Sequence, residues 1–217
     1  MDGRPKHFIF ILIAALMVLG SVMTAGATVT ITDITPGTGT GYSTATISGT
    51  CSSAISGTMT INFGTVMVGT AAVTGTGSFT CIFTVPLHVY GTETITATHD
   101  DGVGGTDGSA TTTFFVIPQV DIVGTATGIV GTIVTISGTG YAGNDIITVS
   151  FGINTTIKQN VAADASGSFT TTFTVDTQKY GTTTISATGA SSTTATASTT
   201  FFIIPQVYSI TPSTGSV

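Results

Sequence analysis

The sequence has few charged residues, no Trp and only two Cys. Of its 217 residues, four are Lys or Arg and ten are Asp or Glu, which amounts to 6% charged residues. An average soluble domain carries about 25%. The net charge is −6, and two of the four basic residues, Arg4 and Lys6, lie at the very N-terminus. A basic surface for nucleic acid is therefore excluded, and we expect no nucleic-acid partner.

Residues with a hydroxyl group and small residues are abundant. Thr and Ser together number 69, Gly numbers 28, and 41% of the chain is hydrophobic. β-Branched Thr favours strands, and good helix formers such as Glu and Lys are scarce, so a helical protein is excluded. A chain this apolar with so little net charge can bury a core, which argues against disorder.

The N-terminus has the three parts of a secretory signal peptide. Arg4 and Lys6 precede an apolar run from Phe8 to Leu19, and small residues follow as far as Ala25–Ala27. We predict that residues 1–27 are a signal peptide that is removed, leaving an extracellular or cell-surface protein with no membrane contact. The alternative is an uncleaved anchor, but the run of 12 residues falls short of the ~20 that span a bilayer.

The rest of the chain is a repeat. All ten Phe residues after position 27 pair between two copies, with offsets that drift between 87 and 90. Such drift indicates one fold with loops of variable length. We predict repeat 1 at 28–118, repeat 2 at 119–205 and the start of a truncated third repeat at 206–217. Three anchors recur in order: Thr46–Thr50 as Thr135–Thr139, Gly77–Thr80 as Gly167–Thr170, and Phe114–Val120 as Phe201–Val207.

Within a repeat, apolar residues recur at every second position, as in Met59, Ile61 and Phe63. This period indicates strands with one core face and one Thr-coated face. Seven short strands in one repeat favour a β-sandwich over the alternative, a small β-barrel, because the repeats adjoin each other with almost no spacer. The predicted strands are 28–34, 43–50, 58–64, 66–74, 78–85, 92–98 and 110–117.

Three segments carry a resemblance to a known family. Pro205–Gly215 resembles the opening of an IPT/TIG-type immunoglobulin-like domain, Gly131–Tyr141 is similar to that family's next segment, and Phe151–Gly152 lies where its third strand ends. The resemblance implies an all-β fold of tandem immunoglobulin-like antiparallel β-sandwiches, as found in surface arrays, adhesins and appendages of secreted enzymes. It brings no catalytic residues. The repeats depart from the pattern at Cys51, where repeat 2 has Gly140, and at Gly124, where the opening Pro would fall.

The residues that carry chemistry are scarce. His7, His88 and His99 do not have metal-ligand spacing, and no Ser lies in a nucleophile elbow. We therefore expect no enzyme, no catalytic residue, no cofactor and no metal site. The acidic stretch Asp100–Asp107 could bind calcium, but a turn-rich hairpin loop is favoured because repeat 2 has no acid at the equivalent Gly189–Ser192.

Two modification sites are predicted. Cys51 and Cys81 are the only cysteines, and both have the parity of core residues. In the sandwich topology their strands, the second and the fifth, are neighbours, and export favours oxidation, so we predict a disulfide. The alternative is two buried thiols. Asn154 begins the single N-x-S/T sequon, which we place on a loop, and it is a possible N-glycosylation site.

Two classes of function fit these observations. The first is a non-catalytic structural or adhesive module of a repeat-built surface protein, whose partners are other surface repeats or an unknown extracellular ligand. The second is an accessory module of a secreted enzyme that could bind polysaccharide. The first is favoured because carbohydrate platforms expose aromatic planes, whereas Trp is absent, the paired Phe have core parity, and Tyr90 and Tyr180 precede a strand, where we expect them to pack.

Overall fold

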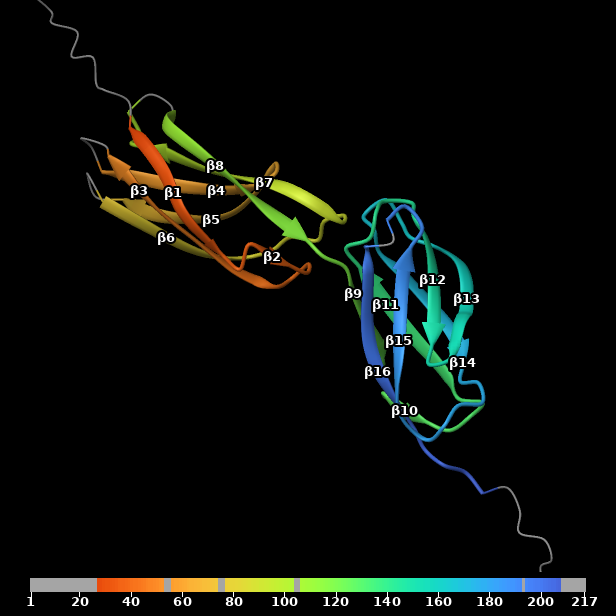
Figure 1. Ribbon diagram of the computed structural model, residues 1–217. Helices are drawn as coiled ribbons and strands as arrows, with labels where there is room; N and C mark the ends of the chain where they lie inside the picture. Colours follow the sequence, from red (N-terminus) through yellow and green to blue (C-terminus); the bar gives the residue numbers. More distant parts are fainter. Residues whose placement is uncertain (1–26, 53–55, 74–76, 104–105, 193, 208–217) are drawn as a thin grey trace, which may run out of the picture.

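The computed structural model describes residues 27–52, 56–73, 77–103, 106–192 and 194–207. The predicted signal peptide and the predicted opening of a third repeat lie outside the described residues, apart from Ala27 and the pair Gln206–Val207. Every regular element in the described residues is a strand (Figure 1). They contain no helix with the length and apolar character that a membrane crossing requires.

The first sandwich has a sheet of three strands facing a sheet of five (Figure 1). The order of the small sheet is β1-β3-β6, and that of the large sheet is β2-β8-β7-β4-β5. Its strands are β1 (Thr28–Thr35), β2 (Thr38–Gly39), β3 (Thr44–Ser52), β4 (Gly57–Phe63), β5 (Val66–Val73), β6 (Gly77–Thr84), β7 (Gly91–Asp100) and β8 (Thr106–Val116).

The second sandwich repeats this arrangement strand for strand. The small sheet has the order β14-β11-β9 and the large sheet β10-β16-β15-β12-β13. Its strands are β9 (Gln119–Val123), β10 (Thr127–Gly128), β11 (Ile133–Thr139), β12 (Ile146–Phe151), β13 (Asn154–Ala162), β14 (Phe169–Thr174), β15 (Gly181–Gly189) and β16 (Thr196–Ile203). Mainly antiparallel sheets in this order form an immunoglobulin-like sandwich, so the predicted fold class is confirmed.

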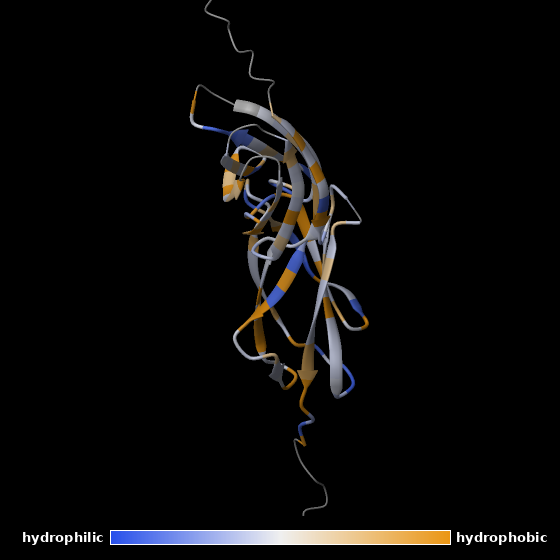
Figure 2. Cartoon of the chain, turned by 90° about the vertical axis from the view of Figure 1, so that its left-hand side faces the viewer, coloured by the Kyte–Doolittle hydropathy of each residue, from blue (hydrophilic) through white to orange (hydrophobic). Residues whose placement is uncertain are grey.

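The alternation of the sequence explains where each core lies. Ile47, Met59 and Ile95 are fully buried in the first sandwich, and Ile136 and Ile185 are fully buried in the second. Thr residues occupy many of the alternate positions and are exposed or half-buried. The hydropathy colours change along the strands accordingly (Figure 2). Each sandwich has its own cluster of buried side chains, so each has the hydrophobic core that a separate domain needs.

Two details differ from the prediction. The first is the two-residue strands β2 and β10, which were not predicted. Each pairs in parallel with the last strand of its sandwich, β8 or β16, and so covers an exposed edge.

The second detail concerns the paired Phe residues. The expectation that all of them face the core is wrong for one pair. Because Phe114 and Phe115 are adjacent in a strand, they point to opposite faces: Phe114 and Phe201 are buried, whereas Phe115 is half-buried and Phe202 is 44% exposed.

Candidate functional site: the junction between the sandwiches

The two sandwiches lie end to end and are joined by a very short linker (Figure 1). β8 ends at Val116 and β9 begins at Gln119, so only Ile117 and Pro118 lie between them. The β11–β12 loop of the second sandwich packs closely against this linker. A Cβ atom built on Gly140 would lie 2.8 Å from the carbonyl oxygen of Ile117, and Gly140 has φ +75°, so only glycine fits without strain.

Tyr90 contacts the second sandwich through its backbone, its hydroxyl and its ring. Its backbone N–H donates to the carbonyl oxygen of Tyr141 over 3.1 Å, and its hydroxyl is hydrogen bonded to Oγ1 of Thr194 over 2.7 Å. Its ring meets the edge of Phe115, with 5.3 Å between the ring centroids. The side chain also packs against the core cluster of the second sandwich. Tyr90 therefore combines apolar burial with two directional bonds across the junction.

The receiving surface of the second sandwich is built around Tyr141. Its ring is fully buried against Phe169, and its hydroxyl donates to the carbonyl oxygen of Ala187 over 3.1 Å. Its own N–H donates to the carbonyl oxygen of Gly167. Burial raises the pKa of the Tyr141 hydroxyl far above its ordinary value, so this hydroxyl stays a donor at any physiological pH. The carbonyl group of Tyr141, which accepts the N–H of Tyr90, is thus fixed by the packing and the hydrogen bonds of Tyr141 itself.

A buried carboxylate organises the turn that carries Thr194. Asp145 is only 3% exposed, and its Oδ1 accepts hydrogen bonds from the N–H and the hydroxyl of Ser191 over 2.9 and 2.7 Å. It also accepts the N–H of Ile146. Burying a polar group of this kind costs free energy unless it is hydrogen bonded. Asp145 therefore connects the β11–β12 loop to the β15–β16 turn, and both contribute contacts to Tyr90.

The predicted Cys51–Cys81 disulfide is not formed: within the described residues, which include both cysteines, no disulfide joins them. The prediction placed their strands correctly, since β3 pairs with β6. The register explains the difference: Cys81 lies opposite Ile47, and Cys51 lies opposite Gly77. Four residues along a strand span about 13 Å, whereas a disulfide needs Cα atoms within about 7 Å. Both side chains are buried, and burial raises the pKa of the Cys81 thiol.

Asn154 is the first residue of β13 rather than part of a loop. Its Nδ2, the atom that a glycan would modify, donates to Oδ2 of Asp176 over 2.9 Å, and its Oδ1 accepts the N–H of Thr156. The side chain is half-buried. N-glycosylation at Asn154 stays a prediction, and it would require the bond to Asp176 to break.

The acidic stretch Asp100–Asp107 runs from the end of β7 into the start of β8. Oδ1 of Asp100 accepts the N–H of Gly102, and Oδ1 of Asp101 accepts the N–H of Val103. These are the local side-chain-to-backbone bonds by which Asp stabilises turns. In the part of the chain that the structure describes, no group of three or more His, Cys, Asp or Glu side chains could hold a metal ion.

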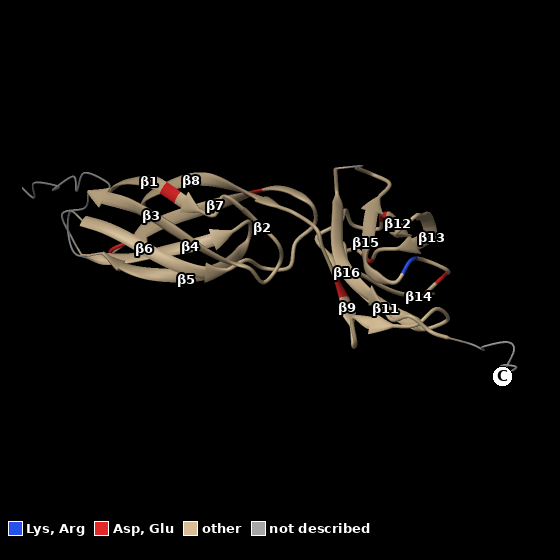
Figure 3. Cartoon of the chain, turned by 60° about the horizontal axis from the view of Figure 1, so that its bottom comes forward, with Lys and Arg blue, Asp and Glu red and all other residues tan. Residues whose placement is uncertain are grey.

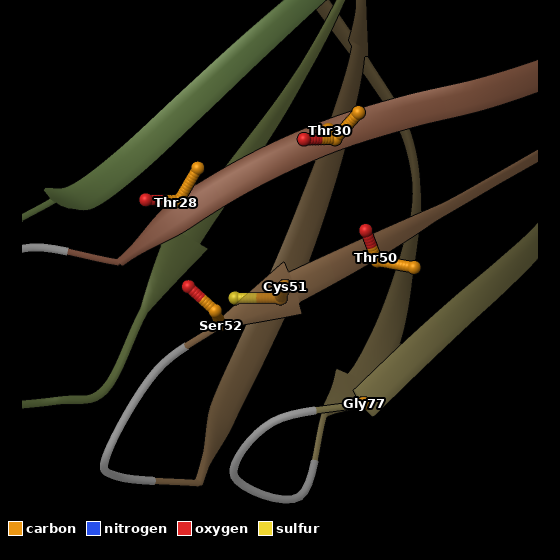
Figure 4. A pocket seen from close by; sticks show the side chains of 6 residues that line it. All are labelled: Thr28, Thr30, Thr50, Cys51, Ser52 and Gly77. Carbon is orange, nitrogen blue, oxygen red and sulfur yellow. The ribbon is translucent and has the colours of Figure 1, made fainter.

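The far end of the first sandwich has a shallow hollow of about 370 Å³. Charged residues are sparse along both sandwiches (Figure 3). Hydroxyl side chains from β1 and β3 line the hollow, among them Thr28, Thr50 and Ser52, together with Cys51 (Figure 4). A hollow lined by neutral hydroxyls, without a carboxylate or an imidazole, has hydrogen-bonding capacity but no effective general acid or base.

Sequence reasoning expected Tyr90 to pack but did not identify it as a junction residue. The available signal was its position: it repeats as Tyr180, and in both copies a Gly and a strand come directly after it. Which loops approach the neighbouring sandwich depends on the orientation of the modules, and a single repeat does not contain that information.

Comparison with known proteins finds likeness at the level of structure. The sequence matches no protein-family model, and no curated protein matches it. Adhesin InvE of Yersinia pseudotuberculosis is 17% identical with a TM-score of 0.39, and the match covers 82% of this chain and 60% of that one. A 282-residue fragment of intimin, in complex with the intimin-binding domain of its receptor Tir, is 21% identical with a TM-score of 0.33, covering 80% and 64%.

A transglutaminase of red sea bream also matches, at 10% identity with a TM-score of 0.36, covering 82% of this chain and 31% of that one. This chain thus spans less than two thirds of the length of each of these three proteins. The three matches include one enzyme, and all three TM-scores are below 0.5. No conclusion about function rests on these likenesses.

Proposed function

We propose that the chain is a non-catalytic structural or adhesive part of a secreted, repeat-built cell-surface protein. The junction carries this proposal. Two sandwiches with separate cores are connected by two residues and by the contacts of Tyr90 with Tyr141 and Thr194. Such a connection maintains a set distance and direction between modules, which is what a surface spacer or an adhesin stalk requires.

The surface chemistry agrees with an extracellular role. The outer faces of the strands carry Thr, which provides hydrogen bonds without charge, and only Lys158 and Lys179 are basic among the described residues. We propose that residues 1–27 direct export, that repeats 28–118 and 119–205 are IPT/TIG-type modules, and that 206–217 opens a third. The partners would be other surface repeats or an extracellular ligand, with no nucleic acid and no membrane after signal cleavage.

The alternative is an accessory module that binds polysaccharide for a secreted enzyme. One observation favours it: Tyr180 is exposed at the rim of a hollow of about 570 Å³ that Gln178 and Lys179 also line. An exposed ring beside polar groups is a common arrangement for sugar binding. A single ring without a second, parallel one provides little stacking area, so the surface role is the better account.

Surface labelling tests the proposal. Antibodies raised against purified residues 28–207 should label intact cells of the source organism, and brief protease treatment of those cells should remove the label. Antibodies against a cytoplasmic protein serve as the control and should label only lysed cells. If the protein is detected only after lysis, the proposed location and role are wrong. A deletion strain should also lose adherence or surface-layer integrity rather than a metabolic activity.

A further inference from the structure

An apolar patch at the far end of the second sandwich corresponds to the surface that forms the junction in the first. We define the distal patch as Tyr180, Phe202 and Ile204, whose side chains are 75%, 44% and 43% exposed. They align with Tyr90, Phe115 and Ile117. Large apolar side chains gathered on one surface typically mark an interaction site.

The backbone beneath the patch matches that of the junction. Thr92 pairs with Phe115 in the first sandwich, and Thr182 pairs with Phe202 in the second. The glycine directly after each Tyr has a positive φ, +127° at Gly91 and +112° at Gly181. Tyr180 is therefore presented from the same kind of turn as Tyr90, next to the same neighbouring strand.

The loop that carries Tyr180 is held in place by Gln178. Nε2 of Gln178 donates to the carbonyl oxygen of Phe151 over 3.1 Å and to Oδ1 of Asp176 over 2.9 Å, so the loop is tied to the end of β12. A side chain displayed by an ordered loop loses less entropy on binding than one on a mobile loop. Tyr180 is thus exposed on an ordered loop, which favours binding to a partner.

The segment that follows the second sandwich indicates which partner the distal patch would contact. Ile204–Val207, at the end of the second sandwich, has the same sequence as Ile117–Val120, which joins the first sandwich to the second. A hollow of about 240 Å³, lined by Tyr180, Ile204 and Pro205 among others, lies beside this segment. The same linker beside the same aromatic side chains predicts the same geometry for the next module along the chain.

We propose that the distal patch is a docking surface for a further sandwich that continues the chain from Gln206. In it, the N–H of Tyr180 donates to a backbone carbonyl of the next β11–β12-type loop, and its hydroxyl bonds to a side chain of the next β15–β16-type turn. This inference rests on the proposed repeat-built organisation and adds the contact that would orient successive modules. A second copy of this chain fits less well, because its Tyr141 and Thr194 already contact its own Tyr90.

An extended chain tests the inference: residues 28–205 joined directly to a second copy of residues 119–207, which restores the Ile-Pro-Gln-Val linker. Hydrogen exchange is measured at the amide of Tyr180. Relative to the chain 28–217, we expect its exchange to slow by about fivefold or more, the effect of one net hydrogen bond. The amide of Tyr90 should be protected equally in both chains and is the internal control.

Variants separate docking from folding. Tyr180→Phe should remove only the hydroxyl bond and reduce the protection slightly, whereas Tyr180→Ala should release the third module without changing protection at Tyr90. Ile82→Ala, at an exposed apolar residue of β6 away from the patch, should change neither. Unprotected Tyr180 in a folded extended chain would overturn the docking surface.

Other occupants give different results. If the chain 28–217 forms dimers in sedimentation experiments that Tyr180→Ala abolishes, the occupant is a second copy and the proposal is wrong. If soluble xylan or cellulose fragments change Tyr180 fluorescence in that chain, the patch binds sugar and the proposal is equally wrong. Surface labelling of cells is independent of these results, so a failed docking surface and a failed surface role can be told apart.

Discussion

At one pair of neighbouring positions, each repeat has one glycine and one larger side chain, and the two repeats place them the other way round. In the first sandwich, His99 on β7 lies over Gly57 at the start of β4, and a Cβ on Gly57 would come within 2.5 Å of its Nε2. In the second sandwich, the equivalent of Gly57 is Asp145 and the equivalent of His99 is Gly189. There, a Cβ on Gly189 would overlap Oδ2 of Asp145. The His99 side chain therefore packs where Gly57 has no side chain, and the Asp145 side chain packs where Gly189 has none.

This exchange predicts that Gly189→Ala destabilises the second sandwich by about 1–3 kcal/mol, as overpacking of a buried site typically does. In an Asp145→Gly background the cost of Gly189→Ala should largely disappear, because the side chain that it meets is gone. Chemical denaturation measures both. Gly37→Ala is the control, since the nearest atom to its Cβ would be 3.9 Å away. Equal costs of Gly189→Ala in the two backgrounds would contradict this explanation.

The cysteines provide a second prediction at the residue scale. Because Cys51 and Cys81 are buried and separated by the register of β3 and β6, the native protein should contain two thiols. The raised pKa of Cys81 lowers its thiolate fraction at neutral pH, so iodoacetamide should react slowly until the protein is unfolded. Mass spectrometry without reducing agent should then find two labels per chain. A chain that takes up no label after unfolding would indicate the disulfide.

At the scale of elements, period-two alternation was enough to predict the seven longer strands of the first repeat to within a few residues. It could not predict β2, because two residues show no period, or the register, which depends on turn geometry. The register explains why Cys51 and Cys81 are not joined in this structure although their strands were correctly placed. Adjacent Phe114 and Phe115 show a related limit: alternation assigns one of them to the core and the other to the opposite face.

The β13–β14 loop next to Tyr141 predicts a pH effect. Oδ1 of Asp164 accepts the hydroxyl of Ser166 and the N–H groups of Ser168 and Ser166, and these bonds lower its pKa. A lowered folded-state pKa contributes stability that is present above the ordinary Asp pKa of about 3.9 and is lost as pH falls through the folded value.

Thermal unfolding between about pH 5 and pH 2 tests this contribution. The second sandwich should lose stability over this range, and Asp164→Asn, which has no charge to lose, should show a smaller loss. The comparison between the two proteins isolates Asp164 from the other carboxylates. An identical pH dependence in both would show that the loop contributes nothing through its charge.

At the scale of the whole molecule, Tyr90 and the short linker should hold the two sandwiches as one unit. Tyr90→Ala removes the ring contact with Phe115, the bond to Thr194 and the packing of the ring against the second core, but it changes no buried residue of either core. The variant should therefore keep two folded modules, with a circular dichroism spectrum of sheet, while the modules reorient independently.

The most direct measurement is ¹⁵N NMR relaxation of the chain 28–217, which gives a rotational correlation time for each sandwich. Both sandwiches should share one correlation time, close to that of a single body of their combined mass, and Tyr90→Ala should give two shorter times. Two separate, shorter correlation times in the unaltered chain would contradict a rigid junction.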